Sequence, residues 1–276
     1  MRYFVGVDGG ASRLDVLVAD ETGRRLGRGH SGPIYGGNGK DHINARIHML
    51  DAVDEALVAS NISGEQVAGI FLSCANWRSL RSAEASEWLS VLKIAPEAIT
   101  VNDDGDLSAL WAAANFPDPA IMVSLGTFWG STGVADALEF SHLTDSLDVT
   151  QASADLGSGV TIGSLALGAA ISAPFGGRPT QLTELLCTQL AVEDAEGLRT
   201  WARQYRSPAD RAHLCSIAAQ AAQAGDAVAL LLFAQAGVGV AQATIPMAHY
   251  MKCADRPLTI ALSGNVWRAG SCITTP

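Results

Sequence analysis

The chain opens with Tyr3-Phe4-Val5-Gly6-Val7-Asp8-Gly9-Gly10-Ala11-Ser12-Arg13-Leu14-Asp15, a pattern from which much of the architecture can be read. We expect a strand over residues 3–7, a tip of one acid, two glycines and a hydroxyl, and a second strand over residues 15–19. Gly9 and Gly10 can adopt positive φ and bring backbone N–H groups close to an anion. Asp8, at the strand end, suits Mg²⁺, which keeps several waters and takes one or two carboxylates. The same residues also suit an ordinary hairpin turn, so the tip alone leaves both interpretations open.

The composition indicates a folded protein with a sizeable core. The chain has 276 residues, of which 48% are hydrophobic, so intrinsic disorder is not expected. This length suits one large domain or two ordinary ones, and we expect two lobes. The formal net charge of -10 argues against nucleic acid and against an anionic membrane surface as partners. An anionic substrate would therefore need Mg²⁺, backbone donors and a few placed cations.

Cysteine and histidine usage favours a reducing compartment and no zinc site. The five cysteines are scattered without a C-x-x-C pair, as is typical of free thiols: Cys74, Cys187, Cys215, Cys253 and Cys272. No two of the six histidines are four residues apart, so zinc ligation from one helix face is not expected. No secretory signal is indicated, because Asp8 interrupts the apolar residues at 5–7. We expect a cytoplasmic protein.

Residues 227–251 contain no Asp, Glu, Lys or Arg, and this length could span a bilayer. However, the segment contains glutamines, glycines, Pro246 and His249, and its bulk is alanine rather than leucine or isoleucine. A transmembrane span and a helix of a globular core are both open, and the weak apolarity favours the core helix. An Ala- and Leu-rich helix such as 226–236 could also bury a face against a second copy, so a homodimer is one alternative.

Strands and helices are expected to alternate along the chain. In the first half the expected strands are 3–7, 15–19, 25–29, 67–73 and 99–101, and the expected helices are 41–60, 83–92 and 107–114. The second half restarts with a strand over 120–125 and a glycine-rich turn over 126–133, followed by Ala-rich helices between 162 and 251 and a strand over 258–262. This alternation predicts an α/β fold with parallel strands. The first helix would bury Ile47, Leu50, Val53, Leu57 and Val58, which recur at helical spacing.

The order of strand, glycine turn and strand at 3–19 recurs at 120–135, which suggests a duplication. We expect an N-terminal lobe over residues 1–117 and a C-terminal lobe over residues 118–276, the second with a helical insertion. The second lobe is expected to be short at its C-terminal end, because only nine residues follow Trp267.

A further chemical segment is Val101-Asn102-Asp103-Asp104-Gly105-Asp106, which places three carboxylates at a strand end before an expected helix. One of Asp104 and Asp106 would cap that helix, but capping does not need three acids. A carboxylate at this place could accept a proton from an alcohol. Asp103, the closest to the strand end, is our candidate base.

Two glycine turns in the second half complete the set. Ser124-Leu125-Gly126-Thr127-Phe128-Trp129-Gly130-Ser131-Thr132-Gly133 leads from a strand into a turn that could hold phosphates, although alone it is a weak signal. Ala261-Leu262-Ser263-Gly264-Asn265-Val266-Trp267 ends a strand with a glycine that lets a nucleoside approach the backbone. The hairpin tip at residues 8–10, the carboxylate at Asp103, the turn at 126–133 and the late glycine, in that order, form a far more specific pattern than any one of them.

In this order the segments resemble the sugar kinase, Hsp70 and actin superfamily, and within it the N-acetylglucosamine kinases and BadF-type ATPases. The resemblance spans nearly the whole chain and rests on residues 5–10 with Ser12, on 101–103, on 126–127, on Asp155-Leu156-Gly157-Ser158-Gly159 with Ile162-Gly163, and on 264–267. It implies two ribonuclease-H-like (actin-like ATPase) lobes, related by duplication, that close over a central cleft.

The resemblance also implies an activity, the ATP- and Mg²⁺-dependent phosphorylation of an amino sugar, N-acetylglucosamine or glucosamine, to the 6-phosphate. It makes Asp103 the general base and places Asp8 near the metal. The implied ATP and phosphate contacts are Gly9, Gly10, Ser12, Gly126, Thr127 and Gly264. The implied substrate contacts are Asn38, Asn102 and Asp155.

Departures from the family pattern keep other functions open. Ala11 stands in place of a third glycine, Phe128-Trp129 in place of a Gly-Ser pair, and Leu156 in place of a glutamate. One alternative is therefore a catalytically impaired nucleotide-binding relative. Another is a BadF-type ATPase that activates an acyl-CoA dehydratase, although the cysteines are not clustered for an iron–sulfur cluster.

Overall fold

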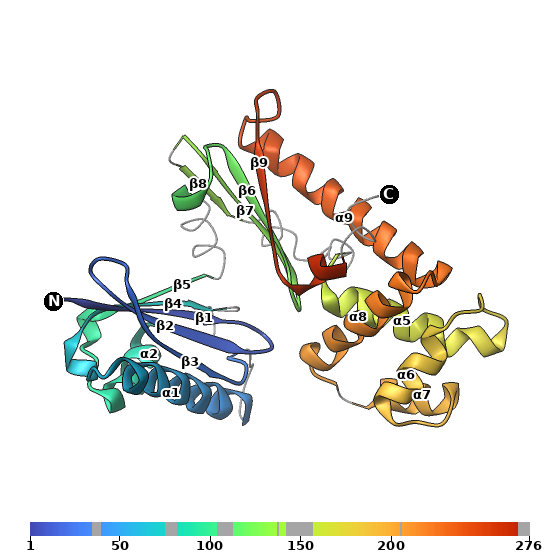
Figure 1. The fold of residues 1–276 in the computed structure, drawn as a ribbon, viewed down its shortest axis with the longest axis horizontal. Helices are drawn as coiled ribbons and strands as arrows, with labels where there is room; N and C mark the ends of the chain where they lie inside the picture. The colour runs from blue at the N-terminus through green and yellow to red at the C-terminus, as the bar shows by residue number, and fades with distance from the viewer. Residues whose placement is uncertain are drawn as a thin grey trace. The chain divides into compact units, whose positions relative to one another are not determined.

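The computed structural model describes residues 1–34, 40–74, 82–103, 113–136, 138–141, 157–204 and 206–269. The chain divides into two compact units, Met1–Ser108 and Ala109–Pro276. Each unit contains one β-sheet with helices packed on it, which confirms the mixed α/β class (Figure 1).

The first unit is built on a five-stranded sheet. Its strands are β1 (Tyr3–Gly9), β2 (Leu14–Asp20), β3 (Arg25–Ser31), β4 (Val67–Cys74) and β5 (Ile99–Asp103), in the order β3-β2-β1-β4-β5. The strands β1, β2 and β3 are antiparallel, whereas β1, β4 and β5 run parallel. Parallel strands place their carboxyl ends at one edge, so the ends of β1, β4 and β5 lie next to each other in the sheet.

Helix α1 (Lys40–Ser60) packs against β3 and β2, and α2 (Ser82–Leu89) packs near β5. Short 3-10 turns cover Gly64–Gln66, Ser90–Leu92 and Pro96–Ala98. The first helix was predicted correctly, but its buried face was only partly right. Ile47 and Val58 are 48% and 71% exposed, and small residues such as Ala52 and Ala56 are buried instead. The reason is close packing, because a Cβ on Gly29 of β3 would overlap the carbonyl oxygen of Ala52.

The second unit is built on a four-stranded sheet. Its strands are β6 (Ala120–Leu125), β7 (Trp129–Ala135), β8 (Leu138–Ser141) and β9 (Thr259–Ser263), in the order β8-β7-β6-β9. The expected turn over residues 126–133 was too long, because residues 129–134 of the strand β7 pair with β6 in antiparallel fashion. The turn is therefore only residues 126–128. β9 pairs with β6 in parallel, so this sheet repeats the order and directions of the strands β3, β2, β1 and β4 of the first unit.

Most of the described residues between β8 and β9 are helical. The helices are α5 (Gly159–Ser172), the 3-10 turn η5 (Ala173–Phe175), α6 (Leu182–Leu190), α7 (Ala195–Arg203), α8 (Pro208–Gln223) and α9 (Ala227–Tyr250), and η6 (Asn265–Ala269) follows β9. Polar residues begin four of these helices, because Ser158, Asp194, Ser207 and Asp226 each accept a hydrogen bond from a backbone N–H of the first turn.

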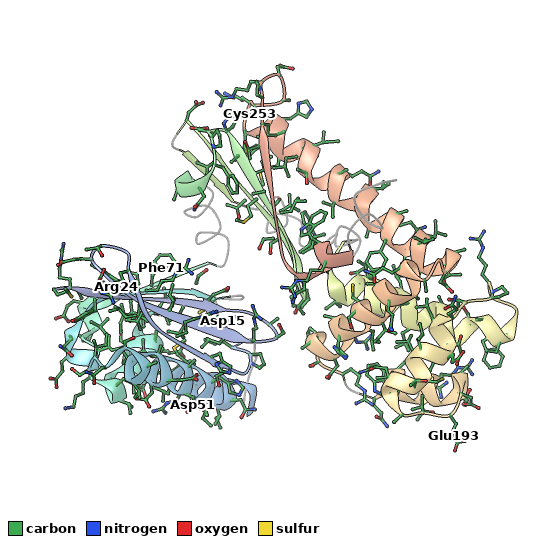
Figure 2. All side chains as sticks on the ribbon, viewed as in Figure 1. Asp15, Arg24, Asp51, Phe71, Glu193 and Cys253 are labelled. Carbon is green, nitrogen blue, oxygen red and sulfur yellow. The ribbon has the colours of Figure 1, made fainter. Side chains whose placement is uncertain are left out.

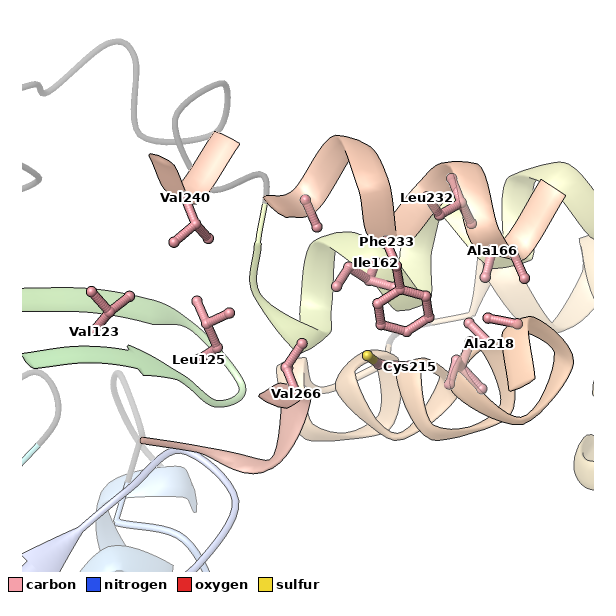
Figure 3. Close-up of a cluster of buried hydrophobic side chains, with 14 of the residues drawn as sticks. Val123, Leu125, Ile162, Ala166, Cys215, Ala218, Leu232, Phe233, Val240 and Val266 are labelled. Atoms are coloured by element: carbon pink, nitrogen blue, oxygen red, sulfur yellow. The ribbon is translucent and has the colours of Figure 1, made fainter. Parts of the chain in front are cut away.

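The main core of the second unit lies where α5, α8 and α9 meet the sheet. Phe233 of α9 is fully buried, and it belongs to one cluster with Ile162 of α5 and Cys215 of α8 (Figure 3). Leu125 and Val123 of β6 extend the same cluster into the sheet. The helical insertion and the sheet therefore share one hydrophobic core.

Helix α9 is the segment whose length and composition would also suit a membrane span. In the structure it packs against α8, α5, β6 and β7. Phe233, Ala236 and Met247 are each at most 1% exposed and belong to the core cluster. This packing agrees with the core helix favoured by the sequence.

Candidate functional site

The hairpin between β1 and β2 has the tip that the sequence predicted, with β1 two residues longer and β2 one residue longer at the turn. Asp8 and Gly9 still belong to β1 and pair with Asp15 and Leu14 of β2. The N–H of Gly10 donates to the carbonyl oxygen of Arg13 at 2.9 Å, which closes the turn. Ser12 is exposed at the tip. The turn therefore exposes the Ser12 hydroxyl to solvent, close in the sequence to the Asp8 carboxylate.

The carboxylate of Asp8 lies in a charged neighbourhood. Asp15 is its cross-strand partner and is marked near the turn end of β2 in Figure 2. Arg13 neutralises Asp15, with Nε 2.7 Å from its Oδ2. The pKa of Asp8 is raised, first because the surrounding chain removes water from its carboxyl group and second because Asp15 repels its charge, while Arg13 partly offsets both. A cation bound beside Asp8 would relieve this repulsion.

The register of the parallel strands brings the other predicted residues of this unit to the same edge. Asp8 of β1 is in register with Ser73 of β4, and Ser73 is in register with Asn102 of β5. The next row contains Gly9, Cys74 and Asp103. Neighbouring strands are about 4.8 Å apart, so the backbone of Asp103 lies roughly 10 Å from that of Gly9. The candidate base and the hairpin tip are thus two strands apart at one sheet edge.

The side chains of Asn102 and Asp103 lie outside what the structure describes, which fixes only their backbone in β5. Asn38 and Asp155 lie outside the described residues altogether, as do most residues of the expected helix 107–114. The roles of these four polar residues stay predictions.

The second glycine turn is held by the start of a helix. The N–H of Gly126 donates to the carbonyl of Phe128 at 3.0 Å, which makes the turn between β6 and β7. The first two N–H groups of α5, from Gly159 and Val160, donate to the carbonyls of Gly126 and Thr127 at 2.9 and 3.1 Å. These donors are therefore occupied, and their effect is to fix the turn rather than to bind an anion directly.

Gly264 brings the end of β9 against the same place. Its φ is +98°, and a Cβ on this residue would overlap the carbonyl group of Leu125, the last residue of β6. Only glycine combines this left-handed conformation with so close an approach. After this corner, Trp267 donates from Nε1 to the carbonyl of Val123 at 3.2 Å, and Val266 is buried in the core.

Three segments that are far apart in the sequence therefore meet at the carboxyl end of β6. They are the turn 126–128, the start of α5 at Gly159 and the corner at Gly264. The sequence predicts the first and the last as nucleotide contacts but does not predict that the first residues of α5 hold the turn. The Asp155–Gly159 motif was a signal for this, because its glycine begins the helix.

The two aromatic residues of this turn lie in different surroundings. Trp129 is the first residue of β7 and packs, partly buried, against the hydrophobic core. Phe128 is 39% exposed. Thr127 is partly exposed between Gly126 and Phe128.

Among the residues that the structure describes, no group of three or more His, Cys, Asp or Glu side chains could hold a metal ion. In this part of the chain Cys187, Cys215 and Cys253 are free thiols, and Cys74 is buried. The donor set at the hairpin tip is instead one partly solvated carboxylate, Asp8, with Asp15 engaged by Arg13. One carboxylate with several waters is a coordination that Mg²⁺ accepts.

The sequence matches no protein-family model and no curated protein, but solved structures share the fold. A proposed N-acetylglucosamine kinase from Chromobacterium violaceum is 20% identical with a TM-score of 0.72, and 98% of this chain aligns with 89% of that one. A proposed N-acetylglucosamine kinase from Porphyromonas gingivalis is 18% identical with a TM-score of 0.67, over 100% and 90% of the two chains. The ROK family glucokinase from Streptomyces griseus, solved with glucose and AMPPNP, is 16% identical with a TM-score of 0.65, over 98% and 86%. The chain therefore has the fold of these sugar kinases.

Proposed function

We propose that the chain is an ATP-dependent kinase that phosphorylates an amino sugar, N-acetylglucosamine or glucosamine, at its 6-hydroxyl group. The observation that carries the proposal is the meeting of the turn 126–128, the start of α5 and Gly264 at the end of β6. Two rigidly held glycine segments at one strand end suit a nucleotide, because its phosphates and ribose need close backbone approach. The fold shared with a glucokinase solved with AMPPNP supports the same reading.

In this proposal each unit contributes one phosphate-binding turn. Gly126 and Thr127 contact phosphate in the second unit, with Gly264 beside the nucleoside. Gly9, Gly10 and Ser12 contact phosphate in the first unit. The repeated strand order of the two sheets supports an origin of these turns by duplication. Phosphoryl transfer needs little covalent help, so the main task of these residues is to hold the phosphates in place.

Asp8 is the residue that would hold Mg²⁺, directly or through water. Bound there, the ion would supply charge neutralisation for the phosphates. The chain's own part is to place the Asp8 carboxylate at the end of β1, where Arg13 engages the neighbouring Asp15 and partly offsets its repulsion.

Asp103 accepts the proton of the sugar hydroxyl in this proposal. Its place at the end of β5, in the same register row as Gly9 and two strands away, suits a base that acts close to the transferred phosphoryl group. Asn102, Asn38 and Asp155 are the proposed contacts to the sugar. Loss of a general base typically lowers the rate by about 10² to 10⁴.

The test is ADP release from Mg-ATP in the presence of N-acetylglucosamine, glucosamine, glucose or no sugar. We expect turnover that depends on an amino sugar and that falls by about 10² or more in Asp103→Asn. Asp51→Asn is the matched control, because Asp51 is exposed on α1 (Figure 2) and should leave the rate unchanged.

Glucose-dependent turnover would keep the kinase and correct its substrate. Tight AMPPNP binding without turnover on any sugar would instead favour a nucleotide-binding relative that lacks kinase activity. Full activity of Asp103→Asn would remove Asp103 from the mechanism.

A further inference from the structure

The segment Ser31–Ile34, which begins at the last residue of β3, contacts both the hairpin tip and helix α1. At one end, the N–H of Ile34 donates to the carbonyl of Gly10 at 3.3 Å. The Ile34 side chain, which is 7% exposed, fills the space beside Gly9, where an added Cβ would lie only 2.6 Å from its Cγ2. Ile34 therefore supports the hairpin tip through both its backbone and its side chain.

At the other end, His48 of α1 holds the same segment. Its Nδ1 lies 2.7 Å from the carbonyl oxygen of Pro33, and since a carbonyl only accepts, Nδ1 carries the proton. The imidazole ring also lies directly against Gly32, where an added Cβ would overlap its Cε1. The ring is partly buried in this position. A short hydrogen bond and a close ring contact thus fix two consecutive residues of the segment.

We propose that His48 is a positioning residue for the phosphate-binding tip of the first unit. By holding Gly32 and Pro33, it keeps Ile34 in place under Gly9 and Gly10. It acts through the segment Ser31–Ile34 and touches neither phosphate nor the reacting atoms. The inference rests on the proposed function for its effect on ATP, whereas its structural part concerns only the described contacts.

A pair of variants separates the hydrogen bond from the bulk of the ring. His48→Ala removes both, whereas His48→Asn keeps a donor at the position of Nδ1 and removes the rest of the ring. The matched control is His213→Ala, which removes an exposed histidine on α8 in the other unit, where its ring lies within hydrogen-bond distance of Gln189.

Hydrogen exchange measured by mass spectrometry or NMR reads the positioning directly and needs no kinase activity. In His48→Ala the amides of Gly10 and Ile34 should exchange about 3- to 10-fold faster, as the loss of one hydrogen bond would allow. In His48→Asn and His213→Ala their exchange should stay close to that of the parent protein. Unchanged exchange in His48→Ala, or equally fast exchange in His48→Asn, would overturn the proposal.

Kinetics then separates positioning from a general loss of folded protein. If His48 positions the tip, His48→Ala raises KM for Mg-ATP by about 3- to 10-fold and changes kcat less, and His48→Asn restores KM. A loss of folded protein would instead lower kcat and leave KM unchanged, which would count against the proposal.

A second measurement needs no variant and covers the case in which His48→Ala does not fold. Binding of Mg-AMPPNP to the parent protein should slow exchange at Ile34 as well as at Gly10, because the two residues share a hydrogen bond. Protection of Gly10 without Ile34 would overturn the inference. Absence of AMPPNP binding would instead overturn the proposed function, and the exchange of the variants would still decide the role of His48.

Discussion

Gly264→Ala tests whether the corner after β9 must lie against the backbone of β6. The φ of +98° is in the left-handed region, where a side chain costs about 1–2 kcal/mol. The new Cβ would also overlap the Leu125 carbonyl and lie 2.9 Å from the Leu125 nitrogen. These are backbone atoms that cannot rotate away, and such overpacking costs about 1–3 kcal/mol. We therefore expect a loss of about 2–5 kcal/mol in the free energy of unfolding.

Gly176→Ala is the matched control for the conformational part of this cost. Gly176 lies in the same unit and has a φ of +95°, but an added Cβ would find nothing within 4 Å. This variant should lose only about 1–2 kcal/mol. The difference between the two variants isolates the contact between Gly264 and Leu125.

Denaturant unfolding followed by tryptophan fluorescence measures both variants, and calorimetric titration with Mg-AMPPNP measures the effect on the nucleotide. We expect Gly264→Ala to weaken AMPPNP binding by about tenfold or more, since about 1.4 kcal/mol of lost contact suffices. Gly176→Ala should bind as the parent protein does. Equal losses of stability in the two variants, or unchanged binding in Gly264→Ala, would refute the reasoning.

Two further predictions concern the helical insertion. Asp226 accepts hydrogen bonds from Thr180 Oγ1 and from the N–H groups of Gln181, Val228 and Ala229, so Asp226→Ala should lower the free energy of unfolding by about 2–4 kcal/mol, measured by denaturant titration. Burial opposes the charge of Asp226, but these hydrogen bonds outweigh the effect of burial and lower the pKa of Asp226. The charge therefore stabilises the fold fully above about pH 4, and the stability advantage of the parent protein over Asp226→Asn should shrink as the pH falls through the lowered pKa. A stability advantage that grows on acidification would contradict this. Burial raises the pKa of the Cys215 thiol to about 12, so at pH 8 a disulfide reagent should label Cys215 on the order of 10³-fold more slowly than a solvent-exposed thiol. Rapid labelling of Cys215 in the native protein, mapped by mass spectrometry, would show that this core opens.

Most of the helices and strands could be predicted because each is encoded by a short, local stretch of sequence. The tip at residues 8–10 was predicted from an apolar strand that ends in an acid and two glycines, and the structure closes it with a bond from Gly10 to Arg13. The strand β7 was partly missed because its glycines and hydroxyls are typical of a turn. Its pairing with β6 decides the outcome, and that pairing is a tertiary contact.

The candidate site depended on contacts that no local pattern shows. The approach of Gly264 to Leu125 joins residues that are far apart in the sequence, and only the fold brings them together. His48 looked like an ordinary helical residue, because its role depends on a carbonyl in the preceding connection. The buried face of α1 was predicted only in part for a similar reason. The nearby Gly29 of β3 favours alanines over larger side chains where the helix contacts the strand.

The length of helix α9 couples the helical insertion of the second unit to its sheet. The 24 residues of α9 make a rod about 36 Å long. One end is tied by Asp226 to Gln181 before α6, and the other packs by Met251 against Gly133 of β7. Figure 1 shows α9 running from the other helices of this unit to its sheet. A tilt of about five degrees at one end of such a rod moves the other by about 3 Å. Repacking of the insertion would thus shift the end of α9 against the hairpin that carries the turn 126–128.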